Sequence, residues 1–228
     1  MAIVSLGGIG KDYVSDAGVT TQVLKSVDLE VEAGDFVAIM GPSGSGKSTL
    51  MNVLGTLDRA SRGVYELDGE DVSRYDDAAL ARLRNRTIGF VFQGFNLLPR
   101  RTVLDNIMLP LFYSGENRPE RRRRAEHYLE QVGLRSYRDY FPNQLSGGQQ
   151  QRIAIARALA GEPVLLLADE PTGNLDSHTT KEILELFNAL NQEGMTIVLV
   201  THEEDVSRYA KRLVHVKDGE IVYDGPNY

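Results

Sequence analysis

The sequence has 228 residues, of which 42% are hydrophobic and 25% charged, values that are ordinary for a globular protein and argue against a disordered or fibrous chain. The formal net charge of −7 argues against nonspecific nucleic-acid binding as the main activity, because that activity needs a basic face. The absence of cysteine excludes disulfides and thiolate metal sites. There is no apolar run near the ~20 residues that span a membrane, and no export signal, so we expect a soluble chain that is not exported.

The N-terminal part is predicted to form an antiparallel pair of strands. Residues 3–6 and 27–31 have strand patterns, and the second alternates apolar and polar residues as an exposed edge strand does. A polar loop at residues 15–21 separates them. Tyr13 stands just before this loop. An aromatic ring there can stack on an adenine base, although a single tyrosine at a strand end more often simply packs.

A glycine-rich loop follows the apolar run at residues 36–40 and leads into a helix predicted to extend to about residue 57. Strand, glycine loop and helix is the context that a phosphate-binding loop requires, and a chance glycine-rich turn is the alternative. The glycines bring backbone N–H groups close to phosphate oxygens, and Lys47 supplies a cation for the β- and γ-phosphates. The Ser48 hydroxyl is placed to ligate a Mg²⁺ ion that bridges them. The residues predicted to bind ATP in this loop are Gly41, Ser43, Gly44, Ser45, Gly46, Lys47, Ser48 and Thr49.

A second buried strand is predicted at residues 88–92, after a short strand at 63–69 and a charged helix at 77–86. Gln93 follows the buried strand directly. A glutamine at this position often only caps the strand, but in an open α/β sheet the carboxyl ends of the strands are also where ligands bind.

A helical insertion is predicted next, because helical patterns occupy about residues 103–160 with no strand among them. We therefore expect a single domain over residues 1–228, with its core at about 1–93 and 163–228 and a helical subdomain at about 94–162. The arginines of this insertion stand beside Glu116, Glu120 and Glu126 and have no interleaved aromatic residues, so a solvated helix face is favoured over a nucleic-acid patch. The arginines concerned are Arg118 and Arg121 to Arg124.

The last predicted helix of the insertion begins after Ser146 and extends to about Ala160. Ser146 is a good N-cap, and Gly147 and Gly148 leave backbone amide groups uncovered. This helix start is therefore a second candidate anion site, with ordinary capping as the alternative.

Two adjacent carboxylates, Asp169 and Glu170, follow a continuous apolar run at residues 164–168 that predicts a strand buried on both faces. Structural reasons for such a pair are hard to find, whereas phosphoryl transfer uses one carboxylate to handle Mg²⁺ and another to activate water. His202 follows the next buried strand, at residues 196–200. Together with Gln93, these residues place polar groups at the ends of three strands of one sheet, which favours a shared site.

These motifs together resemble the ATP-binding cassette (ABC) ATPases, over nearly the whole chain. Tyr13 is similar to the adenine-stacking aromatic of that family, residues 41–48 to the Walker A loop and Gln93 to the Q-loop. Residues 145–149 are similar to the signature sequence and residues 164–169 to Walker B. The remaining matches are Glu170 to the catalytic glutamate, residues 174–176 to the D-loop and His202 to the switch histidine.

The resemblance implies a P-loop NTPase (RecA-like) α/β fold, with a mostly parallel core, an N-terminal antiparallel β subdomain and a helical insertion. It implies ATP and Mg²⁺ as cofactors, Glu170, His202 and Gln93 as catalytic residues, and Ser48, Gln93 and Asp169 as the metal site. It also implies a homodimer in the ATP-bound state, in which two chains pair head to tail and each closes the other's ATP. The residues that would bind ATP in trans are Ser146, Gly147, Gly148, Gln149 and Asp176.

Finer features resemble the branch that includes the lipoprotein-releasing, macrolide-export and cell-division ATPases, namely residues 89–93, 95–99, 146–152 and 168–176. This resemblance implies a membrane permease partner with an extracytoplasmic domain, a location at the cytoplasmic side of the cell (inner) membrane, and no nucleic-acid partner. Arg100 and Arg101 depart from the branch, which usually has an apolar residue before Thr102. Because segment 95–101 lies near the docking groove of the family, we expect Phe95, Leu97 and Leu98 to form its apolar centre and the two arginines its charged rim. The alternative is that these residues only pack the helical subdomain.

Two alternatives remain at this point. A soluble ABC ATPase of translation or DNA repair would carry the same motifs, but such proteins usually have two cassettes or a long coiled-coil insertion, and this sequence has neither. A P-loop kinase would not explain residues 145–149 or His202.

Overall fold

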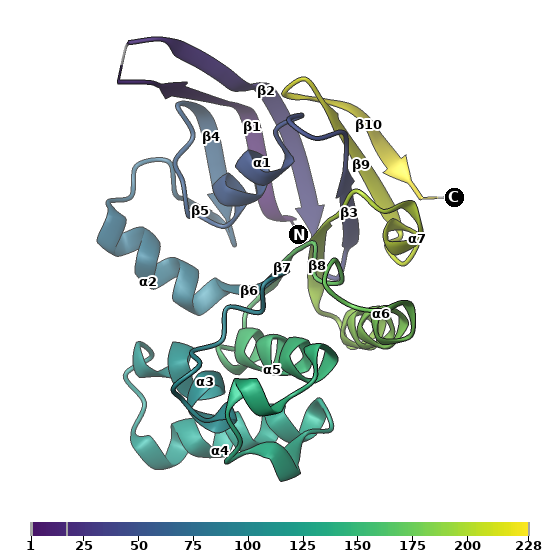
Figure 1. Ribbon diagram of the computed structural model, residues 1–228. Helices are drawn as coiled ribbons and strands as arrows, with labels where there is room; N and C mark the ends of the chain where they lie inside the picture. Colours follow the sequence, from purple (N-terminus) through teal and green to yellow (C-terminus); the bar gives the residue numbers. More distant parts are fainter. Residues whose placement is uncertain (1, 17, 228) are drawn as a thin grey trace.

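The structure, a computed structural model, describes residues 2–16 and 18–227. Within these residues the chain forms an antiparallel sheet, a mostly parallel sheet and a block of helices inserted between two strands of the parallel sheet (Figure 1). The predicted fold class is confirmed. None of the helices in the described ranges is long and apolar enough to cross a membrane.

The antiparallel sheet is built mainly from the N-terminal hairpin, whose two strands are much longer than the pattern predicts. Register shifts between Leu6 and Ile9 insert a bulge that breaks the apolar alternation, so the periodic signal ends early although the pairing continues to Val14. The second strand is an edge strand, as predicted. The strands, in spatial order, are β2 (Thr20–Glu32), β1 (Ala2–Val14), β4 (Arg62–Leu67) and β5 (Glu70–Asp71).

The second sheet contains the buried apolar runs, and its strands from β9 to β6 are parallel. β10 closes the sheet antiparallel to β9 through Asp218 and Gly219, whose positive φ angles of 50° and 80° fit a tight hairpin turn. The strands, in spatial order, are β10 (Glu220–Pro226), β9 (Arg212–Lys217), β3 (Phe36–Met40), β8 (Thr196–Val200), β7 (Leu165–Asp169) and β6 (Ile88–Phe92).

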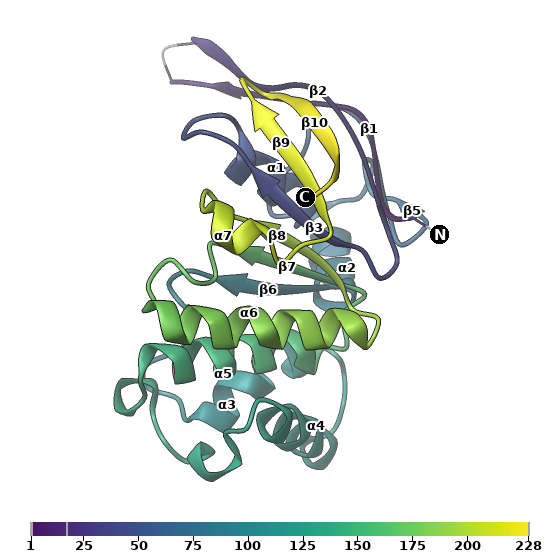
Figure 2. The same cartoon turned by 90° about the vertical axis from the view of Figure 1, so that its right-hand side faces the viewer.

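Helices cover both faces of the parallel sheet (Figure 2). α1 (Lys47–Leu54) and α2 (Asp77–Thr87) pack with one set of strand residues, among them Val37. α5 (Gly147–Ala160) and α6 (Ser177–Gln192) pack with the alternate set, among them Ala38. Because successive strand residues point to opposite faces, the continuous apolar runs supply both cores at once.

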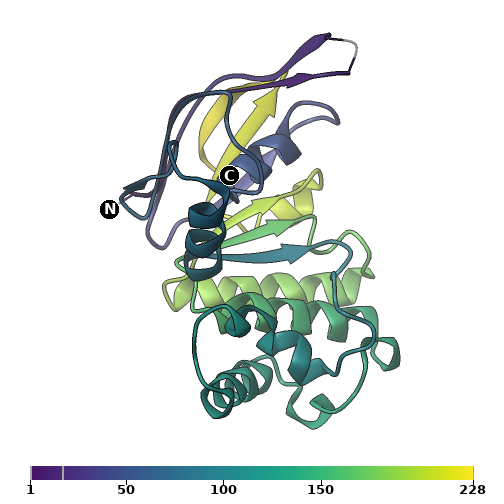
Figure 3. The ribbon, with the colours of Figure 1, turned by 90° about the vertical axis from the view of Figure 1, so that its left-hand side faces the viewer.

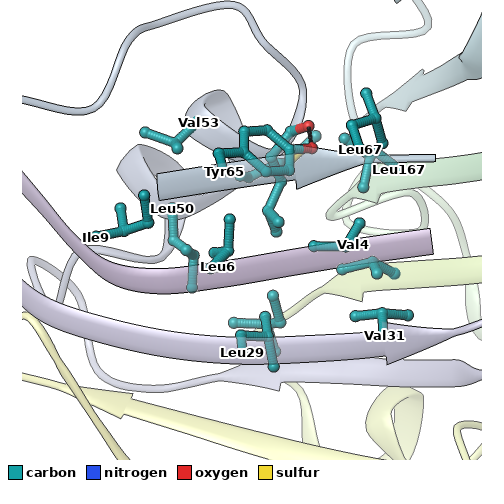
Figure 4. Packing of buried hydrophobic residues seen from close by; sticks show 14 of the residues in the cluster. Val4, Leu6, Ile9, Leu29, Val31, Leu50, Val53, Tyr65, Leu67 and Leu167 are labelled. Atoms are coloured by element: carbon teal, nitrogen blue, oxygen red, sulfur yellow. Dashed lines mark hydrogen bonds between the residues drawn. The ribbon is translucent and has the colours of Figure 1, made fainter. Parts of the chain in front are cut away.

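α1 joins the two sheets. Figure 4 shows Leu50 and Val53 of α1 among apolar side chains of β1 and β4, and the Tyr65 hydroxyl donates a hydrogen bond to the Leu54 carbonyl at 2.6 Å. α1 is shorter than the predicted helix to residue 57. Thr56 adopts a left-handed φ of 51°, which a continuing right-handed helix does not allow.

The helical insertion lies below the parallel sheet in Figure 3 and has its own apolar core. It contains α3 (Val103–Met108), α4 (Arg118–Gln131) and α5, which begin after the N-caps Thr102, Asn117 and Ser146. Shorter helical turns complete the chain, namely η1 (Leu109–Phe112), η2 (Arg135–Tyr137), η3 (Pro142–Gln144) and, outside the insertion, α7 (Glu204–Ser207).

Candidate functional site

Strand register brings the predicted site residues to one edge of the parallel sheet. Phe92, Asp169 and Val200 lie side by side on β6, β7 and β8, and Val200 pairs with Ile39 of β3. The chain segments that follow these positions therefore leave the sheet at the same edge. They carry Gln93, Glu170, His202 and the glycine-rich loop.

The glycine-rich loop wraps around the side chain of Lys47, which is only 9% exposed. Its Nζ donates to the carbonyl oxygens of Gly41 at 2.7 Å and Pro42 at 2.9 Å. Gly41 has a φ of 154°, and a Cβ atom there would overlap the carbonyl of Val216, so glycine is required. The Ser45 Oγ is buried without a hydrogen-bond partner in the described chain. The loop thus surrounds the Lys47 ammonium and the unpaired Ser45 hydroxyl with backbone, and both groups could bind the oxygens of a phosphate.

Glu170 and His202 are joined directly. The Nδ1 of His202 lies 2.8 Å from the Oε1 of Glu170. The backbone of Glu170 has a left-handed φ of 44° and is fixed by its N–H, which donates to the Val200 carbonyl at 2.9 Å. Such strain in a non-glycine residue is characteristic of functional sites.

Asp169 lies beside this pair and is partly buried. Burial and the charge of Glu170 raise its pKa, while the nearby Lys47 lowers it in part. Two neighbouring carboxylates and a single lysine leave excess negative charge, which a bound cation would neutralise.

Gln93 contacts the loop that follows Glu170. Its Nε2 lies 3.4 Å from the Asn174 Oδ1, and the Asn174 Nδ2 donates to the Gln93 carbonyl at 3.0 Å. A Cβ atom on Gly173 would lie 2.6 Å from the Gln93 Nε2, so glycine allows the two segments to touch. Gln93 therefore connects the strand end of β6 to the segment around residues 174–176.

The start of α5 is capped by a reciprocal pair of hydrogen bonds between Ser146 and Gln149. The Ser146 Oγ accepts from the Gln149 N–H at 3.3 Å, and the Gln149 Oε1 accepts from the Ser146 N–H at 2.9 Å. Gly148 packs so closely on Thr179 of α6 that a Cβ atom would overlap its side chain. This helix start lies on the sheet face opposite to α1.

Asp176 caps α6. Its Oδ1 accepts the N–H groups of His178 and Thr179, both at 3.1 Å, and its Oδ2 accepts the Thr179 hydroxyl at 2.6 Å. These bonds hold the pKa of Asp176 below its usual range. Within one chain, Asp176 thus has a structural role, and its expected contact with ATP in trans stays a prediction.

Comparison with known proteins decides the family. Residues 24–173 match the family model described as ABC transporter. This chain belongs to the ABC transporter family. It is 54% identical to the uncharacterized ABC transporter ATP-binding protein YknY of Bacillus subtilis, over 96% of this chain and 95% of that protein. It is also 54% identical to the macrolide export ATP-binding/permease protein MacB of Rhodopirellula baltica, over 97% of this chain but only 33% of MacB.

A solved ABC cassette has the same fold. The dimeric structure of the ATP-binding cassette MJ0796 in a post-hydrolysis state, bound to ADP and Pi, superposes with a TM-score of 0.89 at 43% identity over 99% of both chains. This ABC protein is therefore an ATP-binding ATPase of the transporter class, and the branch indicated by the sequence is confirmed by its MacB-type relatives.

Two polar residues of α5, the buried Gln151 and the partly buried Arg157, support the site and were not among the residues predicted from the sequence. Gln151 of α5 is fully buried, and its amide bonds to the Pro171 carbonyl next to Glu170. Arg157 of α5 donates to the carbonyls of Asn96 at 2.6 Å and Phe95 at 2.9 Å, just after Gln93. A polar residue on the apolar face of a helix indicates that its side chain bonds to another buried group, but the sequence does not show which backbone segment it contacts.

The structure of segment 95–101, which was predicted to dock a permease, differs in part from expectation. Leu97 packs against the core of the helical insertion, while Leu98 is exposed, so the expected apolar centre does not form as one surface. A groove of about 1390 Å³ lies instead between α2, the end of β6 and the turn after α3, and Asn96 lines it. Arg100 and Arg101 are exposed and have no ion pair among the described residues. Neither lines this groove, so their place at the rim of a docking surface stays a prediction.

Proposed function

We propose that the chain binds ATP with Mg²⁺ and acts as a head-to-tail homodimer that drives a membrane permease. One observation carries this proposal. The phosphate loop begins α1 on one face of the parallel sheet, whereas the signature segment begins α5 on the opposite face. A single chain cannot bring both helix starts to one γ-phosphate, but two chains related by a twofold axis can exchange them. The dimeric MJ0796 cassette supports this arrangement.

The residues at the sheet edge fit Mg²⁺ and ATP. Mg²⁺ is usually held by one or two carboxylates together with substrate phosphates, and the proposed protein ligands, Ser48, Gln93 and Asp169, follow that pattern. When bound, the ion supplies positive charge for the β- and γ-phosphate oxygens. Lys47 supports the same oxygens, and Tyr13 would stack on the adenine ring.

Glu170 is the proposed general base. Its carboxylate would accept a proton from the attacking water, and His202, already within hydrogen-bond distance, would orient that carboxylate and contact the γ-phosphate. Gln93 would contact the same phosphate through Mg²⁺. Its hydrogen bond with Asn174 would link that phosphate to the segment that faces the second chain in the dimer. Loss of the γ-phosphate would then open the dimer.

The partner in this proposal is an integral membrane permease with an extracytoplasmic domain, and the chain would bind it at the cytoplasmic side of the inner membrane. The MacB relatives, whose names include both ATP-binding and permease functions, support such a partner. The groove of about 1390 Å³ that Asn96 lines is the proposed binding place for a segment of the permease. A permease encoded beside this chain would support this partner.

The Glu170→Gln variant tests the proposal. The side chain keeps its shape but loses the base, so hydrolysis should fall by about 10²- to 10⁴-fold while ATP still binds and the dimer accumulates. Size-exclusion chromatography with ATP and Mg²⁺ measures the dimer, and phosphate release measures turnover. Glu193→Gln, at the far end of α6, is the matched control and should behave as the parent. If Glu170→Gln hydrolyses ATP at the parental rate, Glu170 is not the general base.

A further inference from the structure

Tyr13 is held by a hydrogen-bonded cluster away from the catalytic edge. Its hydroxyl donates to the Asp58 Oδ2 at 2.7 Å, and the Lys11 Nζ donates to the Asp58 Oδ1 at 2.6 Å and to the Arg59 carbonyl at 2.8 Å. The same ammonium group lies 4.8 Å from the centroid of the Tyr13 ring. Tyr13 therefore has two restraints, one on its hydroxyl and one on a face of its ring.

Asp58 is the centre of this cluster. Besides Tyr13 and Lys11, it accepts the N–H of Arg59 at 2.7 Å. Burial alone would raise the pKa of Asp58, but the hydrogen bonds from Lys11, Tyr13 and Arg59 outweigh it and leave that pKa below its usual range. The carboxylate is thus ionised and fully engaged at neutral pH, and charge-assisted hydrogen bonds of this kind are the stronger ones.

The cluster connects two distant segments. Asp58 follows the end of α1, and its own N–H donates to the Asn52 carbonyl of α1 at 3.1 Å. Tyr13 lies near the end of β1, 45 residues earlier in the chain. Through Asp58, the aromatic ring on β1 is therefore fixed to the helix whose other end carries the phosphate loop.

We propose that Asp58 is a positioning residue for nucleotide binding, which holds the Tyr13 ring as a preformed platform for the adenine base at a fixed place relative to the phosphate loop. This inference rests on the proposed function, in which ATP occupies that loop and its base stacks on Tyr13. Lys11 occupies one face of the ring, so the base stacks on the other. The Tyr13 side chain is 41% exposed, and a free tyrosine with that exposure would lose rotamer freedom on binding. Asp58 removes that cost in advance.

The test measures equilibrium binding of ATP to the isolated chain by calorimetry in EDTA, where hydrolysis does not interfere. Asp58→Ala and Tyr13→Phe both remove the Tyr13–Asp58 hydrogen bond, so each should weaken ATP binding by about three- to tenfold. Asp58→Ala also removes the bonds that Asp58 accepts from Lys11 and Arg59. The double variant should bind ATP no more weakly than Asp58→Ala, because the Tyr13–Asp58 bond that Tyr13→Phe removes is already absent in Asp58→Ala. Asp58→Asn keeps an acceptor for the hydroxyl and should recover most of the affinity.

Inorganic tripolyphosphate, used as a competitor, separates positioning from general damage. It keeps the phosphates but lacks the base, so its affinity should be the same in all these variants. Asp77→Ala is the matched control, because Asp77 pairs with Arg59 at 2.7 Å but does not touch Tyr13. It should leave ATP binding unchanged. Equal losses for ATP and tripolyphosphate, additive effects of the two single variants, or unchanged ATP binding in Asp58→Ala would each overturn the inference.

Tyr13→Ala distinguishes this inference from the proposed function. If Tyr13→Ala leaves ATP binding unchanged, the base does not stack on Tyr13 and that part of the proposed function fails. If Tyr13→Ala weakens ATP binding while Tyr13→Phe and Asp58→Ala do not, stacking is correct and only the role of Asp58 is wrong. Tyr13→Phe changes one exposed hydroxyl, so it tests the inference even where Asp58→Ala disturbs folding.

Discussion

The side-chain amide of Gln151 donates a hydrogen bond to the backbone carbonyl of Pro171 at 2.6 Å, inside the protein. Gln151 belongs to α5, the helix that begins at the signature segment, and Pro171 follows Glu170 directly. The Gln151 Oε1 has no hydrogen-bond partner in the described part of the chain. A buried amide that satisfies only half of its groups costs stability. The hydrogen bond from Gln151 to the segment that carries the strained Glu170 indicates that this buried amide serves the function of the site.

Gln151→Leu should therefore lower kcat by about 10- to 100-fold with little change in ATP affinity, because Glu170 would lose the support of its neighbouring backbone. Steady-state phosphate release and calorimetric ATP binding measure the two quantities. Asn191→Ala is the control, since Asn191 is also buried and its amide bonds to the Gly34 and Met195 carbonyls. It should lower the melting temperature but not kcat of the folded protein. Unchanged kcat in Gln151→Leu would show that the bond is only structural.

Asp169→Asn should stabilise the nucleotide-free chain at neutral pH. Burial and the charge of Glu170 raise the Asp169 pKa in the folded state, so the folded protein binds a proton there more readily than the unfolded chain. The ionised carboxylate opposes folding above that raised pKa, and its cost disappears as the pH falls toward the ordinary carboxyl value of about 3.9.

Thermal unfolding without nucleotide or Mg²⁺ tests this prediction at pH 7 and at pH 4. At pH 7 the melting temperature of Asp169→Asn should exceed that of the parent by about 2–4 °C for each kcal/mol of unfavourable charge removed. The difference should shrink at pH 4. The variant should also lose ATPase activity, since a proposed Mg²⁺ ligand is gone. A lower melting temperature at pH 7 would mean that the attraction to Lys47 outweighs burial and repulsion.

Local sequence signals predicted the parts of this structure that depend on local chemistry. Continuous apolar runs indicated the parallel strands, and Gly41 and Gly46 indicated a loop that only glycine allows. The predicted carboxyl ends of those strands then located the sheet edge at which Glu170 and His202 lie in contact. The roles of Tyr13 and of the signature segment came from the resemblance to a family rather than from their own chemistry.

Contacts between distant segments were not predictable in this way. Asp58 and Tyr13 are 45 residues apart, and Gln151 and Pro171 lie on different elements, so no periodic pattern relates them. Most of β1 was not predicted, because the alternation of apolar and polar residues is lost where the bulge shifts the strand register. Leu97 was expected to face a partner, with packing on the helical core as the alternative. Only the packing of α3 to α5 decides that it faces the core.

Charge reversal at Arg100 and Arg101 tests the proposed contact with a permease. Both side chains are exposed beside the segment that Arg157 fixes to α5, and neither has an ion pair in the described residues. Replacing both by glutamate should weaken co-purification with a co-expressed permease, because rim charges act on association. Basal ATPase activity of the isolated chain should stay near the parental value.

The control for this prediction is charge reversal at Arg122 and Arg123, which are also exposed but are paired with Glu126 and Glu120 on α4. The two double variants change the net charge equally, so only position distinguishes them. If the contact lies at Arg100 and Arg101, their reversal should reduce the recovered permease much more than the control does, and the loss should depend on salt concentration. Equal recovery from both variants would place the permease contact elsewhere on the chain.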